Sequence, residues 1–198
     1  MDNPSSRFKI VNFLLAWGGA SLGFPFGGVV ALSLAGPMDD AVSAALGGLL
    51  AGAVVGAAQW FVVRLYLGID LTWIVATASG LALGNTLGAI LAGFGEGIGD
   101  LLLIGAVAGA VVGAAQWSML RERLRYAGLW VLALAVAWPL GWTSTWFIGA
   151  DISLGYPVFG ADGALVFAAV SGAVLLAMIR KLSLTPTAVA QAKNPPPR

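Results

Sequence analysis

Residues 51–60 read Ala-Gly-Ala-Val-Val-Gly-Ala-Ala-Gln-Trp, and the same ten letters return at residues 108–117. The shift of 57 residues between these stretches extends well beyond them. It also relates Gly27, Gly84 and Gly141, and it relates Trp73 to Trp130. Self-similarity at a fixed period is the mark of a repeated structural unit. The 198-residue chain therefore predicts three copies of one unit, each made of two apolar stretches followed by an Arg.

Composition indicates a membrane protein. Hydrophobic residues make up 59% of the chain, charged residues make up 10%, and the mean hydropathy is +0.91. A soluble domain carries about 25% charged residues. A small globule keeps much of its chain at the surface, so it could not hide this much apolar area from water. A lipid bilayer removes that conflict.

Six apolar stretches divide the sequence, and most reach the roughly 20 residues that carry a helix across about 30 Å of hydrocarbon. They cover residues 10–36, 41–63, 71–94, 98–120, 129–149 and 163–179. Sustained alternation of polar and apolar residues, the pattern of a strand, is missing. We expect an all-α membrane protein with six transmembrane helices, built as three tandem two-helix repeats and arranged as a pseudo-three-fold bundle.

The expected repeats cover residues 10–66, 67–123 and 124–181, after a cytoplasmic N-terminus at 1–9. The Pro-rich tail 182–198 is expected to be a disordered cytoplasmic segment. Six crossings place all ten Lys and Arg residues on one side of the membrane. The opposite loops carry carboxylates instead: Asp39, Asp40, Glu96, Asp100, Asp151 and Asp162. The positive-inside rule then predicts that both termini are cytoplasmic.

Glycines form stripes along the predicted helices at intervals of four residues, which places them on one helix face. A glycine inside a helix costs about 1 kcal/mol relative to Ala, and in lipid the compensating gain is close contact between helix backbones. We therefore expect helix packing from Gly48, Gly52, Gly56, Gly80, Gly84, Gly88, Gly105, Gly109 and Gly113. The less favoured reading is a thin-walled path or ligand groove. The third repeat has Ala164, Ala168 and Gly172 in place of such a stripe.

A few polar residues lie inside the predicted spans. Gln59 and Gln116 share the glycine-bearing face of their helices, so an interhelical hydrogen bond is the favoured role. The alternative is a polar lining for a ligand or solute, formed by Gln59, Gln116, Asn85, Thr86 and Thr143. The third repeat has Leu175 and Leu176 at the Gln-Trp position, which excludes a three-fold ring of glutamines.

Aromatic and basic residues mark the cytoplasmic ends of the spans. Trp60 and Trp117 precede Arg64 and Arg121 by one helical turn, which is typical of an interfacial aromatic belt with orientation anchors. A clamp for a ring-shaped pigment is the minority alternative for the tryptophans. The candidate site for anionic lipid headgroups is the basic run Arg121, Arg123 and Arg125.

Two other features predict local structure. Pro25 and Pro139 occupy matching positions in first helices, where each removes a backbone donor and favours a kink. The longest outer loop, residues 151–163, carries Tyr156, Pro157 and Phe159, and these suit a segment that lies on the membrane surface.

Missing residue types argue against catalysis. The chain has no His and no Cys, and no ionisable side chain lies near the centre of a span. Metal, haem and nucleophile–base arrangements normally use His or Cys, and proton or ion relays place ionisable groups inside the membrane. We expect no enzymatic activity, no metal, no cofactor and no nucleic-acid binding.

One motif carries a family resemblance. It reads Gly109-Ala-Val-Val-Gly-Ala-Ala-Gln116-Trp117-Ser-Met-Leu120-Arg121, followed by Gly128-Leu-Trp130-Val-Leu-Ala. This pattern resembles a group of uncharacterised bacterial polytopic membrane proteins, and the likeness covers the first two repeats best. It implies a multi-pass protein of the bacterial inner (cytoplasmic) membrane and no particular activity. Three tandem two-helix units are also similar to mitochondrial carriers, but their Pro-x-Asp/Glu-x-x-Lys/Arg signature is absent.

The leading functional hypothesis is a non-enzymatic integral membrane protein with a structural, accessory or complex-subunit role, acting through tight glycine-mediated packing. Its expected partners are the lipid bilayer and either another membrane protein or further copies of itself. The alternative is a passive channel or carrier for a small neutral solute. A pigment- or cofactor-binding membrane subunit is a distant third.

Overall fold

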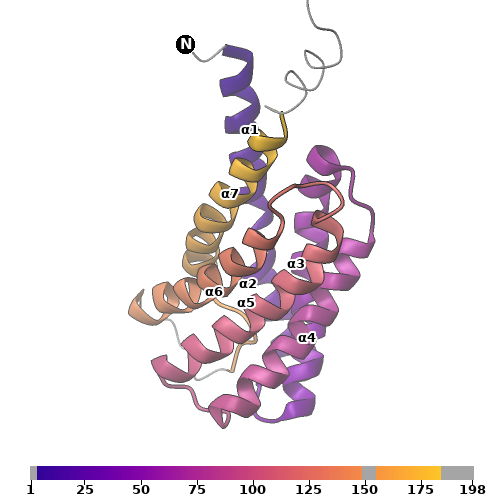
Figure 1. The fold of residues 1–198 in the computed structure, drawn as a ribbon. Helices are drawn as coiled ribbons and strands as arrows, with labels where there is room; N and C mark the ends of the chain where they lie inside the picture. Colours follow the sequence, from indigo (N-terminus) through magenta and orange to yellow (C-terminus); the bar gives the residue numbers. More distant parts are fainter. Residues whose placement is uncertain (1–3, 149–154, 184–198) are drawn as a thin grey trace, which may run out of the picture.

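The computed structural model describes residues 4–148 and 155–183, and these residues form helices joined by short connections (Figure 1). The helices are α1 (Pro4–Ala20), α2 (Gly23–Ala35), α3 (Ala41–Leu67), α4 (Thr72–Ala92), α5 (Ile98–Leu120), α6 (Gly128–Ile148) and α7 (Ala161–Ser183). No strand occurs in this part of the chain.

Six helical segments are long and apolar enough to cross a membrane, which confirms the predicted class. They are Ile10–Ala35, Ala41–Leu67, Thr72–Ala92, Ile98–Leu120, Gly128–Ile148 and Ala161–Arg180. Helices α1 and α2 together supply the first of these spans. Each segment coincides closely with an apolar stretch of the sequence, because the length needed to cross hydrocarbon is a local property of the chain.

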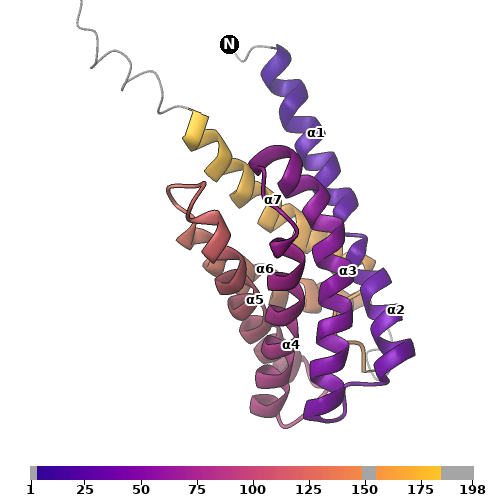
Figure 2. The same ribbon diagram turned by 90° about the vertical axis from the view of Figure 1, so that its right-hand side faces the viewer.

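Consecutive helices lie side by side, from α2 through to α7, and the closest packing joins α3 to α4, α4 to α5 and α5 to α6. Helix α7 returns toward the start of the chain, where it meets α1 and, more slightly, α2. The beginning of α1 and the end of α7 lie at the same end of the bundle (Figures 1 and 2).

The first span is interrupted at Ser21 and Leu22, just before Pro25. Proline has no N–H to donate to the carbonyl four residues earlier, which here belongs to Ser21, and its ring crowds that carbonyl. The Ser21 carbonyl instead accepts a hydrogen bond from the Phe24 N–H at 3.0 Å. Helix α6 continues through Pro139, so of the two predicted kink positions only the first breaks the helix.

Glycines stand where the helices approach most closely. A Cβ added at any of the nine predicted packing glycines would come within 3.0 Å of an atom on the next helix. At Gly48 that atom is the Leu81 carbonyl oxygen at 2.6 Å, and at Gly84 it is the Ala108 Cα at 2.7 Å. A side chain at these places would push two backbones apart, so close contact between helices requires glycine there.

A matched pair of substitutions tests this dependence. At Gly109 an added methyl would collide with the Leu134 carbonyl, whereas at Gly18 nothing lies within 4 Å. We expect Gly109→Ala to lower the free energy of unfolding by about 1–3 kcal/mol through overpacking. Gly18→Ala should leave it unchanged or raise it by up to about 1 kcal/mol through better helix propensity. Equal unfolding free energies of the two variants in mixed micelles would contradict the packing interpretation.

Helix α3 begins with a capping box. The Asp40 carboxylate accepts hydrogen bonds from the Ser43 N–H at 2.8 Å and the Val42 N–H at 2.9 Å. The Ser43 hydroxyl in turn accepts from the Asp40 N–H at 3.0 Å. The Ser43 backbone bond is the main cause that lowers the pKa of the exposed Asp40 carboxyl from its ordinary value of 3.8. Three backbone N–H groups without a partner inside the helix are satisfied in this way.

Because the pKa of Asp40 is lowered, the first turn of α3 should become less stable as the pH falls. A carboxyl whose pKa is depressed by folding stabilises the folded state above its unfolded pKa, and that stability is lost as pH falls through its folded pKa. Amide hydrogen exchange at Val42 and Ser43 should therefore lose protection at pH 3 relative to pH 6. In Asp40→Asn, whose side-chain oxygen still accepts, the protection should not change between these pH values.

Candidate functional site: the buried polar and aromatic interior

The predicted glutamines lie in the interior and bond to tryptophans. The Trp130 indole N–H donates to Gln116 Oε1 at 2.7 Å, which joins α6 to α5. The Gln116 amide then donates to Thr77 Oγ1 at 2.8 Å, which joins α5 to α4. The Thr77 hydroxyl donates a hydrogen bond to the Trp73 carbonyl at 2.7 Å. All these side chains are buried, so the network satisfies polar groups that lipid could not.

A similar contact recurs earlier in the chain and is weaker. The Trp73 indole N–H donates to Gln59 Oε1 at 3.4 Å, a longer bond between α4 and α3. Gln59 and Trp73 precede Gln116 and Trp130 by the same 57 residues.

A third buried tryptophan ties the ends of the bundle together. The Trp17 indole N–H donates to Ser171 Oγ at 3.0 Å and so links α1 to α7. Sequence reasoning missed both residues. Trp17 precedes Trp73 by 56 residues rather than 57, so a search allowing a one-residue gap would have found it. Nothing in the sequence marks Ser171, because it does not align with Gln59 and Gln116, whose place is taken by Leu175.

Aromatic rings fill the middle of the bundle. The ring centroids of Trp17 and Trp130 are 6.0 Å apart, and those of Trp73 and Trp130 are 6.4 Å apart. Toward the other end, Phe24 stacks on Phe159 at 4.6 Å. All five side chains are at most 1% exposed. Large rigid rings therefore occupy the space that a solute path through the interior would need.

The segment 155–160 enters the bundle, which overturns the expectation that Tyr156, Pro157 and Phe159 lie on the membrane surface. Phe159 is 1% exposed, and Tyr156 is half-buried beside Gly28 of α2. The Asn85 amide donates to the Pro157 carbonyl at 2.8 Å. Phe159 packs against Phe24 of α2, Trp138 of α6 and Phe167 of α7, so the segment covers apolar surface among these helices. Asp151 lies outside the described residues.

The segment 155–160 is anchored at both ends. At its start, the Met38 N–H donates to the Gly155 carbonyl at 3.1 Å, where Gly155 has a φ of 68° that favours glycine. At its end, the Gly160 N–H donates to Thr145 Oγ1 at 3.2 Å. The Thr145 hydroxyl donates in turn to Asp162 Oδ1 at 3.3 Å.

The five candidate lining residues do not meet in one place. Gln59 and Gln116 bond to tryptophans, whereas Asn85 bonds to the inserted segment. Thr86 and Thr143 donate to carbonyls of their own helices, at 2.7 and 2.9 Å. Gln59 and Gln116 are linked to each other through Thr77 and Trp73. Among the described residues the other three candidates bond elsewhere, so the five do not form one continuous polar track.

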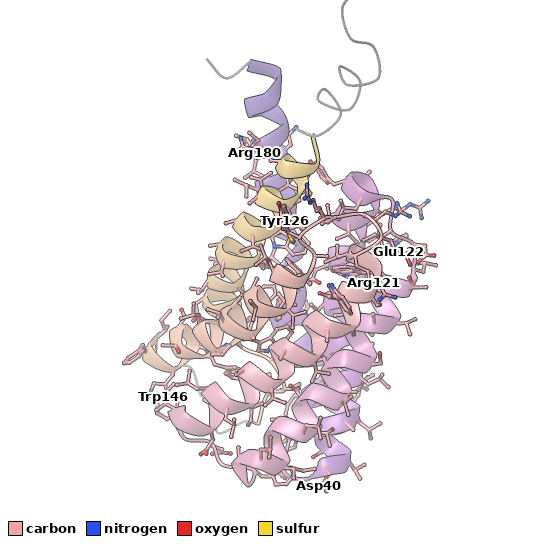
Figure 3. All side chains as sticks on the ribbon, in the orientation of Figure 1. Asp40, Arg121, Glu122, Tyr126, Trp146 and Arg180 are labelled. Atoms are coloured by element: carbon pink, nitrogen blue, oxygen red, sulfur yellow. The ribbon has the colours of Figure 1, made fainter. Side chains whose placement is uncertain are left out.

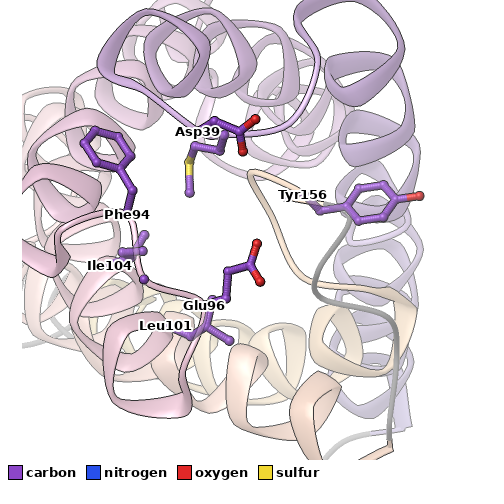
Figure 4. Close-up of a pocket in the computed structure, with 9 residues that line it drawn as sticks. Asp39, Phe94, Glu96, Leu101, Ile104 and Tyr156 are labelled. Atoms are coloured by element: carbon purple, nitrogen blue, oxygen red, sulfur yellow. The ribbon is translucent and has the colours of Figure 1, made fainter.

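A shallow pocket opens at the end of the bundle that carries the carboxylates (Figure 4). Phe94, Leu101, Ile104 and Tyr156 line it, and Asp39 and Glu96 extend their carboxylates around it. In the described part of the chain, no three His, Cys, Asp or Glu side chains come together as a metal site. The pocket combines acidic and apolar surface without convergent catalytic groups.

Arginines stack on aromatic rings at the opposite end. The guanidinium of Arg64 lies 5.0 Å from the Trp60 ring centroid, and that of Arg121 lies 5.1 Å from the Trp117 centroid. Figure 3 places Arg121 and Arg180 at the end of the bundle away from Asp40 and Trp146. These are cation–π contacts at exposed sites.

The other two predicted headgroup residues have different contacts. Arg123 Nη1 donates to the Leu67 carbonyl at 2.7 Å and so binds the end of α3 to the loop after α5. Arg125 lies over Tyr126, 5.6 Å from its ring centroid. The three candidate arginines therefore do not converge on one point.

No protein-family model, no curated protein and no solved structure matches this chain. Its function is therefore inferred from the contacts described above.

The Trp–Gln bonds provide a graded test. Gln116→Leu strands the Trp130 N–H and should lower the free energy of unfolding by about 1–3 kcal/mol. Gln59→Leu removes a longer bond and should cost closer to the average of about 0.6 kcal/mol for hydrogen bonds between membrane helices. Unfolding in mixed micelles, followed by far-UV circular dichroism, measures both. Adding Trp130→Phe to Gln116→Leu removes the stranded donor, so the double variant should lose less free energy of unfolding than the two single variants lose together. A loss equal to or greater than that sum would contradict this account.

Proposed function

We propose that this chain is a non-enzymatic integral membrane protein with a structural, accessory or complex-subunit role. The observation that carries the proposal is the filled interior, where Trp17, Trp73 and Trp130 pack together and Phe24 stacks on Phe159. A bundle closed by its own side chains presents its outer surface as the place of interaction. Large apolar residues cover that surface on every span, as lipid or a membrane partner requires.

The proposal includes a triplicated hairpin in a pseudo-three-fold arrangement. Support comes from the Trp–Gln bond that recurs at a spacing of 57 residues, and from the Trp17–Ser171 bond at the corresponding place between the last helix and the first. The third repeat has diverged most, since it lacks the glutamine and most of the glycine stripe. Its helix α7 also packs less extensively on the first repeat than the other repeats pack on each other.

We further propose that both termini are cytoplasmic, in an inner (cytoplasmic) membrane. The described arginines belong to helix ends and connections opposite the Asp40 end, where Figure 3 places Arg121 and Arg180. Basic residues on one side and carboxylates on the other follow the positive-inside rule.

A passive route for a small neutral solute is the competing hypothesis. The separate contacts of its candidate lining residues and the aromatic filling argue for the packing role instead. A pigment-binding role would use the ring faces of Trp60 and Trp117, over which the guanidinium groups of Arg64 and Arg121 already lie.

Purification from native membranes in mild detergent tests the proposed role. We expect the tagged chain to elute with a companion protein, or with further copies of itself, at a fixed stoichiometry by native mass spectrometry. In reconstituted vesicles we expect no flux of glycerol or urea above that of empty vesicles. A lone monomer whose solute flux falls on Gln59→Leu with Gln116→Leu would overturn the proposal in favour of a passive route.

A further inference from the structure

We propose that the Arg64–Trp60 and Arg121–Trp117 pairs each bind the phosphate of an anionic phospholipid headgroup at the basic end of the bundle. The inference goes beyond the proposed function, because it assigns a ligand and a place to two surface sites. It also differs from the site predicted by sequence, which grouped Arg121 with Arg123 and Arg125.

The two pairs have the same geometry. Each arginine follows its tryptophan by one helical turn at the end of a long span, and the guanidinium lies 5.0 or 5.1 Å from the ring centroid. A guanidinium is planar and carries its N–H donors around its edge. Each guanidinium lies over the face of its indole ring, which restricts its position and leaves its N–H donors without a partner among the described residues. Paired N–H donors fit two oxygens of a phosphate.

Neither guanidinium is used by the protein itself. Arg64 and Arg121 are exposed, and neither side chain donates a hydrogen bond to, or forms an ion pair with, another residue of the described chain. Arg123 provides the contrast, since its Nη1 is held by the Leu67 carbonyl at 2.7 Å. In each pair the arginine is therefore a positioned cation, and its guanidinium N–H groups have no acceptor among the described residues.

The surrounding charges are compatible with an anion. The connections at this end carry Arg64, Arg121, Arg123 and Arg125 against the carboxylates Asp70 and Glu122. Hydrogen bonds from the Thr72 side chain and backbone lower the pKa of the Asp70 carboxyl, and the positive charge of Arg123 adds to this effect. Glu122 follows Arg121 directly and weakens the field there, so we expect the Arg64 site to bind more tightly than the Arg121 site.

The ligand is a lipid rather than a soluble phosphate because of where the pairs stand. Both tryptophans lie at the ends of membrane-spanning helices, at the headgroup level where indole rings concentrate. The neighbouring exposed residues Phe61 and Leu65 are apolar, and they offer surface to the acyl chains of a lipid whose headgroup reaches Arg64.

The chain supplies its own control. Arg180 ends the last span at the same end of the bundle, is also exposed, and has Leu176 rather than Trp one turn before it. Substitution of Arg180 removes the same charge without removing a stacked pair.

Native mass spectrometry of the delipidated full-length protein, titrated with phosphatidylglycerol or phosphatidylcholine, tests the proposal. We expect two phosphatidylglycerol molecules to bind more tightly than the rest. The double variant R64Q with R121Q should lower the affinity of each of these two sites by about fivefold. W60L with W117L should also weaken both, although every charge remains. R180Q should leave both sites unchanged, and circular dichroism and thermal unfolding confirm that each variant is folded.

Four results would overturn the proposal. One is phosphatidylglycerol binding by folded R64Q with R121Q that equals the wild type. A second is an equal loss in R180Q, which would reduce the effect to net charge. The third is displacement of the lipid by low-millimolar inorganic phosphate, which would make the ligand a soluble anion. The fourth is unchanged phosphatidylglycerol binding in W60L with W117L, which would show that the tryptophans take no part in the sites.

Discussion

Contact between helix backbones is the constraint on which the rest of this structure depends. Lipid tails are as apolar as leucine, so helices inside a bilayer gain little from hiding greasy side chains from their surroundings. They gain from dense packing, and the backbones at Gly48, Gly84 and Gly109 approach so closely that no side chain fits. The order of the bundle follows, since each glycine-bearing helix lies directly against the next helix in sequence.

The weakest contact in this arrangement is where the last helix, α7, meets α1 and α2. Helices α3 to α6 use glycine at their contacts, whereas α7 meets α1 and α2 with far less packing. Two sets of side-chain contacts stabilise this part of the bundle. Trp17 lies against Gly172 and bonds to Ser171, and the segment 155–160 places Phe159 against Phe24. Aromatic rings thus take the place of backbone contact along α7, and they fill the interior at the same time.

This substitution of rings for glycines connects the fold to the proposed role. In an interior filled by tryptophan and phenylalanine, Gln116 bonds locally to Trp130 and Thr77. The groups available for interaction then lie on the outer surface. They are the apolar helix faces and the exposed arginines at one end of the bundle. The two sets of features are separable at the arginines, because Arg64 and Arg121 are exposed and their substitution should not loosen the core.

The six spans could be predicted from the sequence because the requirement is local: about 20 apolar residues in a row satisfy it whatever surrounds them. The glutamines were predicted to face other helices for a similar reason, since position on a helix follows from spacing. Separate contacts for Gln59, Asn85 and Thr143 could not be foreseen, nor could the insertion of Phe159 or the bond from Trp17 to Ser171. These depend on segments that are far apart in sequence, 154 residues apart for Trp17 and Ser171, and only packing in three dimensions decides which apolar surface each one covers.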